Sequence, residues 1–353
     1  MKYYNIENLE IIDAGSEGKA VGKQNGLTIF VPFVVPGDVV DVQVFKKKRG
    51  YAEANMIALK KASPDRVEKV CAHFGLCGGC KWQIMDYATQ LHYKQKQVND
   101  NFKYIGKFEY PEIETIIPSE RKYFYRNKLE FTFSNLRWLD EEDMNKQDRG
   151  EKLEVRGLGF HIPGKFDKVL DIEKCYLQTD PSNDIRLAVK KFALENEIDF
   201  YNIRNHEGIL RNMIIRTTST QELMVIMVMT EKNEKTMKLM QFLADQFPEI
   251  NSLQYVVNTK LNDTITDLEI ITYKGNSFIR EKMEDLSFKI GPVSFYQTNS
   301  EQAHHLYKIV REFAQITNTE IVYDLYTGTG TIANFLAKQA KSVIGIEYVD
   351  AAI

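Results

Sequence analysis

The sequence lacks the features of membrane proteins and of unfolded chains. No apolar run reaches the ~18 residues that a bilayer-spanning helix requires, and the first residues do not resemble a signal peptide. Basic and acidic side chains number 46 and 49, so neither sign dominates, and 43% of the 353 residues are hydrophobic. These values exclude intrinsic disorder and collagen-like chains. They predict a soluble, cytoplasmic α/β protein with two or three domains.

Residues 1–62 predict a small all-β barrel. Short segments rich in Val, Ile and Phe alternate with turns, of which Pro36-Gly37-Asp38 is the strongest. About five strands in such a length are typical of an OB-like barrel, which binds nucleic acids through its loops and one strand face. The densest basic cluster follows the turn and consists of Lys46, Lys47, Lys48 and Arg49. It is either a solvated hairpin end or a phosphate-binding patch.

Residues 63–290 predict a central α/β domain. A helix is expected after the first cysteines, and residues 125–134 alternate as a strand does. The charged stretch 140–152 is expected to be a surface loop without chemistry. Further along, the pattern predicts helices over 185–196 and 234–247, a hairpin over 212–229 and a strand over 252–259.

Residues 291–353 predict the beginning of a third domain. A helix over 300–316 precedes a strand, a glycine loop that opens into a helix, and a second strand. This order is one βαβ unit of a parallel sheet, and both strands are expected to be buried. Just upstream, Phe295, Gln297 and Asn299 would lie on one face of a strand, with Asn299 or Ser300 capping the helix.

Four cysteines form a pattern that favours a metal centre. Cys71, Cys77 and Cys80 are spaced C-x5-C-x2-C, and Cys175 follows about a hundred residues later. A cytosolic chain does not normally hold disulfides, so thiolate ligands are the better interpretation. The spacing suits a tetrahedral zinc ion or a [4Fe–4S] cluster equally well.

The glycine loop predicts a nucleoside-cofactor site. Gly328-x-Gly330 follows a strand and leads through Thr331 into a helix, so that backbone can approach a ligand. Glu347 ends the next strand, where an acid can accept both ribose hydroxyls. The pattern fits NAD or S-adenosylmethionine. Asp324 before the turn and Tyr326 within it favour S-adenosylmethionine.

Taken together, these motifs resemble the RNA uracil-5-methyltransferase family, in the branch that has a TRAM domain and an iron–sulfur cluster. The shared order is a PGD-containing barrel, C-x5-C-G-G-C, YRNK, a later cysteine, F-x-Q-x-N, D-L-Y-x-G-x-G and a strand-ending glutamate. The resemblance implies a TRAM barrel, a [4Fe–4S] cluster on the four cysteines, and a Rossmann-like methyltransferase domain. It also implies that a helix over about 84–116 packs on that domain.

The same resemblance implies which residues meet the ligands. Gln297, Tyr326 and Glu347 match positions that contact S-adenosylmethionine, and Asp324, Gly328, Gly330 and Thr331 would complete that site. The expected RNA is 23S ribosomal RNA, with transfer RNA as the second choice. It would lie on the basic cluster 46–49, Arg126 and Phe295. No membrane contact and no obligate protein partner is indicated.

The chemistry implied by the resemblance starts with a cysteine thiolate that adds to C6 of a flipped-out uracil. C5 then takes the methyl group, and a base removes the C5 proton before the thiol leaves. In the family this cysteine and the glutamate base lie in later strands, and nothing similar stands between Glu347 and Ile353. We therefore expect no catalytic residue in this chain, which would be truncated and inactive.

Two other functions fit parts of the sequence. The glycine motif also suits a dinucleotide-dependent iron–sulfur oxidoreductase. A barrel with a structural metal would serve as a non-catalytic RNA-binding module.

Overall fold

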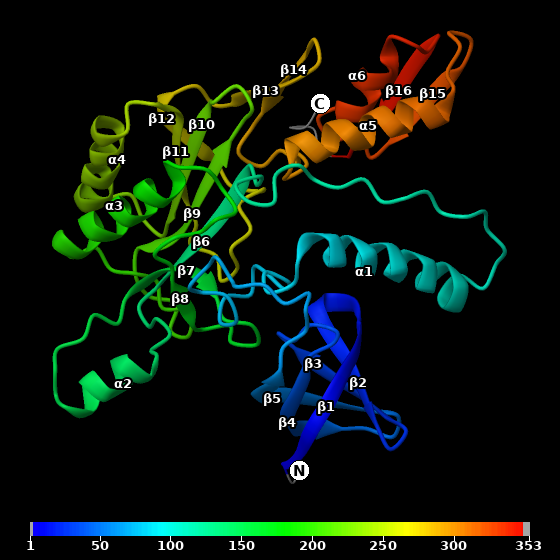
Figure 1. Cartoon of the computed structure of the whole chain (residues 1–353). Helices are drawn as coiled ribbons and strands as arrows, with labels where there is room; N and C mark the ends of the chain where they lie inside the picture. Colours follow the sequence, from blue (N-terminus) through cyan, green and yellow to red (C-terminus); the bar gives the residue numbers. More distant parts are fainter. Residues whose placement is uncertain (1–2, 349–353) are drawn as a thin grey trace. The chain divides into compact units, whose positions relative to one another are not determined.

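The computed structural model describes residues 3–348 and divides the chain into two compact units, Met1–Glu120 and Arg121–Ile353 (Figure 1). Residues 63–120 belong to the first unit and residues 291–353 to the second. The domain division expected from the sequence, at 62 and 290, is finer than these two units and remains a prediction. No helix among residues 3–348 has the length and apolarity needed to cross a membrane.

The first unit begins with a closed five-stranded barrel in the order β1-β2-β3-β5-β4. Its elements are β1 Tyr4–Ala14, the short helix η1 Ser16–Gly18, β2 Lys19–Gln24, β3 Leu27–Pro32, β4 Val39–Lys47 and β5 Tyr51–Lys61. Alternate residues of β4, namely Val40, Val42 and Val44, are buried in the barrel core. The barrel predicted from the hydrophobic alternation is confirmed.

Asp38 of the predicted turn fastens the end of the barrel. Its buried carboxylate accepts hydrogen bonds from the backbone N–H groups of Val35 (2.7 Å) and Ser63 (2.9 Å). It also forms an ion pair with Arg66 at 2.6 Å. The turn signal therefore marks a buried anchor between the barrel and the chain that follows it.

The helix after the cysteines is shorter than expected. Helix α1, Tyr87–Asp100, is capped by the side chain of Asp86 and continues as a π-helical turn, η2, Asn101–Gly106. Lys107 adopts a left-handed conformation (φ 54°) and its N–H bonds back to the carbonyl of Phe102, which ends the helix. The expected range of 84–116 was therefore too long at its C-terminal end. Its packing on a methyltransferase domain remains a prediction.

The second unit is built on a seven-stranded sheet in the order β12-β11-β10-β9-β6-β7-β8. The strands are β6 Lys128–Ser134, β7 Gly157–His161, β8 Val169–Asp171, β9 Leu210–Thr217, β10 Leu223–Met229, β11 Ile250–Val257 and β12 Ile270–Gly275. The predicted hairpin is β9–β10, and β10 pairs in parallel with β11. All seven residues of β10 are buried, because both faces of the sheet are covered.

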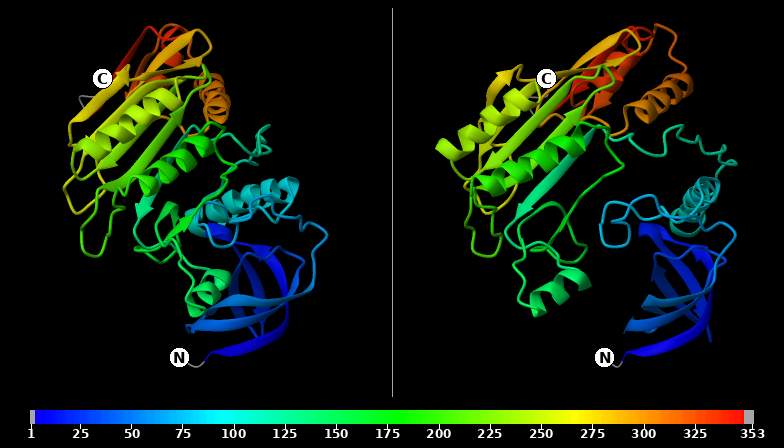
Figure 2. Two further views of the ribbon diagram at one scale, coloured as in Figure 1. Left: turned by 90° about the vertical axis from the view of Figure 1, so that its left-hand side faces the viewer. Right: turned by 60° about the vertical axis from the view of Figure 1, so that its left-hand side comes forward.

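Helices α3, Ser182–Glu195, and α4, Glu234–Gln246, lie on one face of this sheet (Figure 2). They meet through the stacked rings of Phe192 and Phe242, whose centroids are 4.5 Å apart. Both helices were predicted. The opposite face packs against a core from the last hundred residues, which includes Phe288, Tyr296 and Phe335.

That core belongs to the remaining elements of the chain. They are the antiparallel ribbon β13 Ile279–Met283 and β14 Leu286–Ile290, α5 Ser300–Ala314, β15 Ile321–Leu325, α6 Thr331–Ala337 and β16 Ser342–Ile346. Strands β15 and β16 pair in parallel, so the βαβ unit is confirmed. The prediction that they are buried is wrong for the described residues, because the two strands pair only with each other. Tyr323 and Leu325 are 61% and 60% exposed.

The charged stretch 140–152 was another incorrect prediction. Residues Glu141–Asp148 form helix α2 and not a loop. Asp140 and Asp143 make a reciprocal capping box at its first turn. Arg137 also forms an ion pair with the Asp143 carboxylate at 2.6 Å. Local capping thus outweighs the lack of an apolar face.

Candidate functional site

The glycine loop joins β15 to α6 through three left-handed residues. Tyr326, Gly328 and Gly330 have φ values of 67°, 56° and 69°. No atom lies within 4 Å of a Cβ built on Gly328, so the loop is open to a ligand at this point. The ring of Tyr326 is 92% exposed beside it. The sequence predicted this open glycine turn with an aromatic residue inside it.

Two carboxylates fix the shape of this loop. Asp324 Oδ2 accepts hydrogen bonds from Thr327 Oγ1 (2.8 Å) and from the N–H of Ala333 (3.0 Å). Glu347 Oε2 accepts one from the N–H of Gly328 at 2.8 Å. Both acids lie at the ends of parallel strands, so they meet at one sheet edge. The sequence pattern assigned them to the ligand and did not reveal that they also brace the turn.

Thr331 is half-buried and contacts a neighbouring helix. Its hydroxyl lies 3.1 Å from Tyr307 Oη, which ties the start of α6 to α5. Tyr307 is buried. Among the seven residues predicted to contact the cofactor, Thr331 is therefore the one whose hydroxyl forms a hydrogen bond between two helices.

The segment 292–299 is not a strand. Phe295 is 72% exposed, Gln297 is half-buried, and Asn299 caps α5 by accepting a hydrogen bond from the N–H of Gln302. The cap was predicted correctly. The strand was not, because this segment hydrogen-bonds to Asn127 and Arg216 instead of forming a ladder.

Asn127 holds this segment in place. Its side chain donates to the carbonyl of Gln297 (2.8 Å) and to Ser300 Oγ (2.9 Å), and its N–H donates to the carbonyl of Thr298 (2.8 Å). Ser300 Oγ in turn donates to the buried carboxylate of Glu281 at 2.7 Å. The YRNK motif contributed to the family resemblance, but its asparagine had no predicted role. A polar residue just before a buried strand was the available signal.

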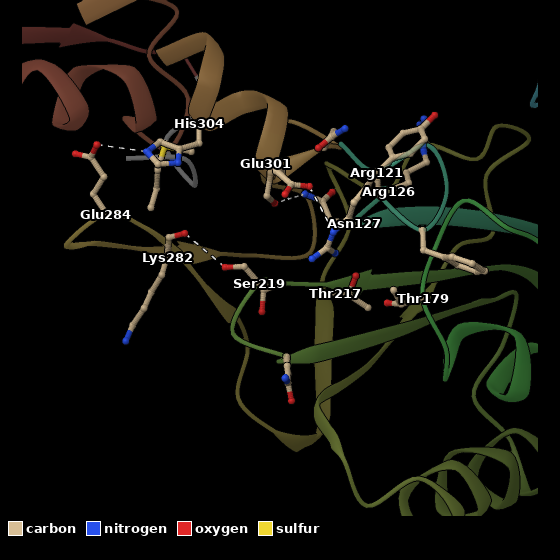
Figure 3. Close-up of a pocket in the computed structure, with 17 residues that line it drawn as sticks. Arg121, Arg126, Asn127, Thr179, Thr217, Ser219, Lys282, Glu284, Glu301 and His304 are labelled. Carbon is tan, nitrogen blue, oxygen red and sulfur yellow. Dashed lines mark hydrogen bonds and ion pairs between the residues drawn. The ribbon is translucent and has the colours of Figure 1, made fainter. Parts of the chain in front are cut away.

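A cavity of about 510 Å³ opens where α5 begins (Figure 3). Arg126, predicted to bind RNA, lines it together with Arg121, and Arg121 forms an ion pair with Glu301 at 3.4 Å. On the other side, Glu284 contacts His304 at 3.3 Å. The cavity is therefore polar and has cations at its rim, which suits a polar or anionic ligand.

Glu284 is held in its charged form. The guanidinium of Arg311 donates two hydrogen bonds of 3.0 Å to this carboxylate and, with a weaker contribution from His304, lowers its pKa to about 2. The Glu284–Arg311 ion pair is thereby fixed beside the cavity.

The basic cluster lies at the β4–β5 hairpin end. Lys46 forms an ion pair with Glu53 at 2.5 Å and lowers the pKa of that carboxyl. The ammonium groups of Lys47 and Lys48 lie over the rings of Tyr4 and Tyr51 at 5.8 and 5.7 Å. The hairpin-end interpretation is confirmed, and phosphate binding by these residues and Arg49 remains a prediction.

The cysteines lie in two places along the chain. Cys71 and Cys80 pack against the buried cluster of Phe74 and Met85, and the N–H of Gly79 approaches Cys77 Sγ at 3.4 Å. Cys175 is buried after β8, and its N–H donates to Asn183 Oδ1. None of the four is in a disulfide. Within residues 3–348, no group of three or more His, Cys, Asp or Glu side chains is arranged to hold a metal ion.

Comparison with known proteins identifies one domain and several relatives. The TRAM domain model matches residues 6–57, which is the barrel. An uncharacterized RNA methyltransferase of Bacteroides thetaiotaomicron is 57% identical over 342 residues, covering 96% of this chain and 75% of the relative. A second, from Porphyromonas gingivalis, is 51% identical and covers 98% of this chain and 75% of that protein.

A solved structure is similar over the same length. It is the Pyrococcus abyssi tRNA (uracil-54, C5)-methyltransferase in complex with S-adenosyl-L-homocysteine. The TM-score is 0.70 at 28% identity, over 98% of this chain and 74% of that one. This chain therefore spans about three quarters of the length of these relatives. With its TRAM barrel and these relatives, the chain belongs to the RNA uracil-5-methyltransferase family.

Proposed function

We propose that this chain is the RNA-binding and cofactor-binding part of an S-adenosylmethionine-dependent enzyme that forms 5-methyluridine in RNA, with 23S ribosomal RNA as the substrate. The observation that carries the cofactor proposal is the glycine loop, which is open at Gly328 and hydrogen-bonded to two strand-end carboxylates. The TRAM barrel and family membership support RNA as the substrate.

The residues around the loop fit S-adenosylmethionine. The open space at Gly328 admits a ligand against the backbone, and the exposed ring of Tyr326 offers a surface for a nucleoside. Glu347 has a carboxylate, the type of group that accepts hydrogen bonds from ribose hydroxyls, and Gln297 would add an amide that donates to the cofactor. The bound cofactor supplies an activated methyl group. The protein side chains bind and orient it, and Asp324 holds the turn that they share.

We assign no nucleophile within these 353 residues. A uracil-5-methyltransferase needs a cysteine thiolate to activate C5 by adding at C6. All four cysteines of the sequence are proposed as cluster ligands, and His304 is occupied by Glu284. The expected behaviour of this chain is cofactor and RNA binding without methyl transfer. A stable covalent adduct with RNA, or turnover, would contradict this assignment.

The proposed cluster ligands are Cys71, Cys77, Cys80 and Cys175, with zinc as the alternative to a [4Fe–4S] cluster. Four thiols outside any disulfide are the right donors for either. An anaerobic preparation with an absorbance band near ~400 nm and about four irons per chain would support the cluster. A colourless protein that contains one zinc per chain would show that the four cysteines bind zinc and not an iron–sulfur cluster. A Cys175→Ser variant should lose the band.

The test of the cofactor is isothermal calorimetry of the full chain with S-adenosylhomocysteine and, separately, with NADH. Binding of S-adenosylhomocysteine that weakens in a Gly328→Val variant supports the proposal. Binding of NADH alone would favour the oxidoreductase. Substrate preference follows from the anisotropy of labelled 23S ribosomal RNA fragments and of a transfer RNA. Tighter binding of the transfer RNA would indicate a transfer RNA substrate, as in the name of the Pyrococcus abyssi enzyme.

A further inference from the structure

The β13–β14 ribbon has two chemically different faces. Its inward side chains are buried in the core of the second unit and comprise Ile279, Glu281, Met283, Phe288 and Ile290. Its outward side chains are Arg280, Lys282, Ser287 and Lys289, which are exposed. Every charged group on the outward face is therefore a cation.

The register of the ribbon places like charges opposite each other. Arg280 pairs directly with Lys289 across the two strands, an arrangement that costs stability when no anion is present. The ring of Phe278 lies close to both cations, 4.9 Å from the Arg280 guanidinium carbon and 5.0 Å from Lys289 Nζ. The face thus combines a half-buried aromatic ring with two flanking positive charges.

Glu284 and Asp285, in the turn between β13 and β14, do not neutralise the outward face. Glu284 is bound by Arg311 and His304, and Asp285 is bound by Lys338. Figure 3 shows the ammonium group of Lys282 directed away from the Glu284 carboxylate.

One acid from another element approaches the ribbon. One carboxylate oxygen of Glu222 lies 3.8 Å from Arg280 Nη1, and the other accepts a hydrogen bond from the backbone N–H of Arg280. Within the described part of the chain, Lys282 and Lys289 form no ion pair with a carboxylate. The face therefore keeps a net positive charge.

A cavity of about 530 Å³ lies beside the ribbon. Phe278 and Lys289 line it, and Ser277, Ser287 and Asn334 add neutral hydrogen-bonding groups. Its volume falls in the range of small-molecule sites, about 300–1,000 Å³, so it can admit one nucleotide. A cation, an aromatic ring and hydroxyl groups are the groups with which proteins hold single-stranded nucleic acids.

We propose that the outward face of the β13–β14 ribbon, with the adjoining cavity, binds a single-stranded segment of the RNA substrate. Lys282 and Lys289 would contact phosphates, and Phe278 would stack on a base. The inference rests on the proposed function, because it takes RNA as the substrate. It adds a second RNA contact outside the barrel's basic cluster, and its cavity reaches Thr329 of the glycine loop.

The experiment measures binding of a fluorescent single-stranded oligouridine to the full chain as salt is varied. For single strands, log K falls with log salt by about 0.7 per phosphate contact, so each lost contact makes this negative slope about 0.7 less steep. A Lys282→Gln/Lys289→Gln variant should therefore lose about 1.4 from the slope and bind about 25-fold more weakly at 0.1 M salt. Phe278→Leu should bind roughly tenfold more weakly with its slope unchanged.

Lys165→Gln is the matched control, because this exposed lysine lies in the loop between β7 and β8, outside the ribbon. It should leave both affinity and slope unchanged. Lysine variants that bind the RNA with the wild-type slope would overturn the inference. So would polyglutamate binding as tight as that of the RNA, since the surface would then recognise acidic peptides. S-adenosylhomocysteine binding is measured on the wild type and on every variant. If the wild type does not bind it, the proposed cofactor is refuted, but the RNA-binding measurements still test the ribbon.

Discussion

Replacing Asp38 by asparagine should lower the stability of the barrel at the end where Asp38 is buried. The carboxylate is fully buried and accepts hydrogen bonds from two backbone N–H groups and from both Nε and Nη2 of Arg66. An asparagine has one acceptor oxygen, so its NH2 group must face at least one of these donors. The change also leaves the guanidinium of Arg66, which is 17% exposed, without its negative partner.

The expected cost is about 3–5 kcal/mol, the usual penalty for removing one partner of a buried ion pair. At 1.4 kcal/mol per factor of ten, this corresponds to an increase of roughly 150-fold or more in the opening equilibrium of the barrel. Hydrogen exchange of the β4 backbone amides measures that equilibrium separately from the second unit. The amides of Val40 and Val42 are the best reporters, because these residues are buried in the barrel core.

Asp41→Asn, in strand β4 just after Asp38, is the matched control. Its carboxylate also accepts a backbone N–H, from Asn8 at 2.9 Å, and pairs with Lys60 at 3.0 Å, but it lies closer to the surface. Solvent screens such a pair, so β4 should remain protected. Equal exchange rates in the two variants would refute the reasoning that burial of the Asp38–Arg66 pair stabilises the barrel.

Three further outcomes follow from the second unit. Asn127→Ala removes two side-chain hydrogen bonds, so the segment that carries Gln297 should lose about 1–3 kcal/mol of local stability. We expect faster hydrogen exchange over residues 297–302, and unchanged exchange would contradict the positioning role of Asn127. Because the pKa of Glu284 is lowered to about 2, its pair with Arg311 stabilises the fold above the ordinary value of 4.5 and loses this effect as the pH falls towards 2. Glu284→Gln should accordingly make the melting temperature less dependent on pH in that range, with a difference of at most about 1 kcal/mol at pH 7. Gly328→Ala should cost about 1 kcal/mol through its φ of 56° alone, since no neighbour crowds the new methyl group, and urea unfolding measures the loss.

Local patterns in the sequence predicted most elements of the fold. The alternation of β4, the apolar faces of α3 and α4, and the glycine turn before α6 are all set by neighbouring residues. Hydrophobic periodicity and turn chemistry act over a few residues, so a single sequence reveals them. Helix α2 was not predicted, because its stability comes from capping side chains and not from an apolar stripe.

The candidate site was predicted in part. The loop residues and both carboxylates were found, since their spacing follows from the βαβ unit. The roles of Asn127 and Glu281 were not, because their partners are 170 and 19 residues away in the sequence. No local pattern indicates which distant backbone carbonyl an asparagine will meet.

The sequence by itself therefore determined the barrel, the βαβ unit, the cysteine pattern and the family, because each depends on residues at short and regular spacing. The tertiary structure alone decided that Asp38 is an anchor, that Asn127 holds the segment before α5, and that the β13–β14 ribbon carries cations on one face only. These properties arise when strands and helices from distant parts of the chain pack together. Burial then sets which charges are paired and which remain available to a ligand.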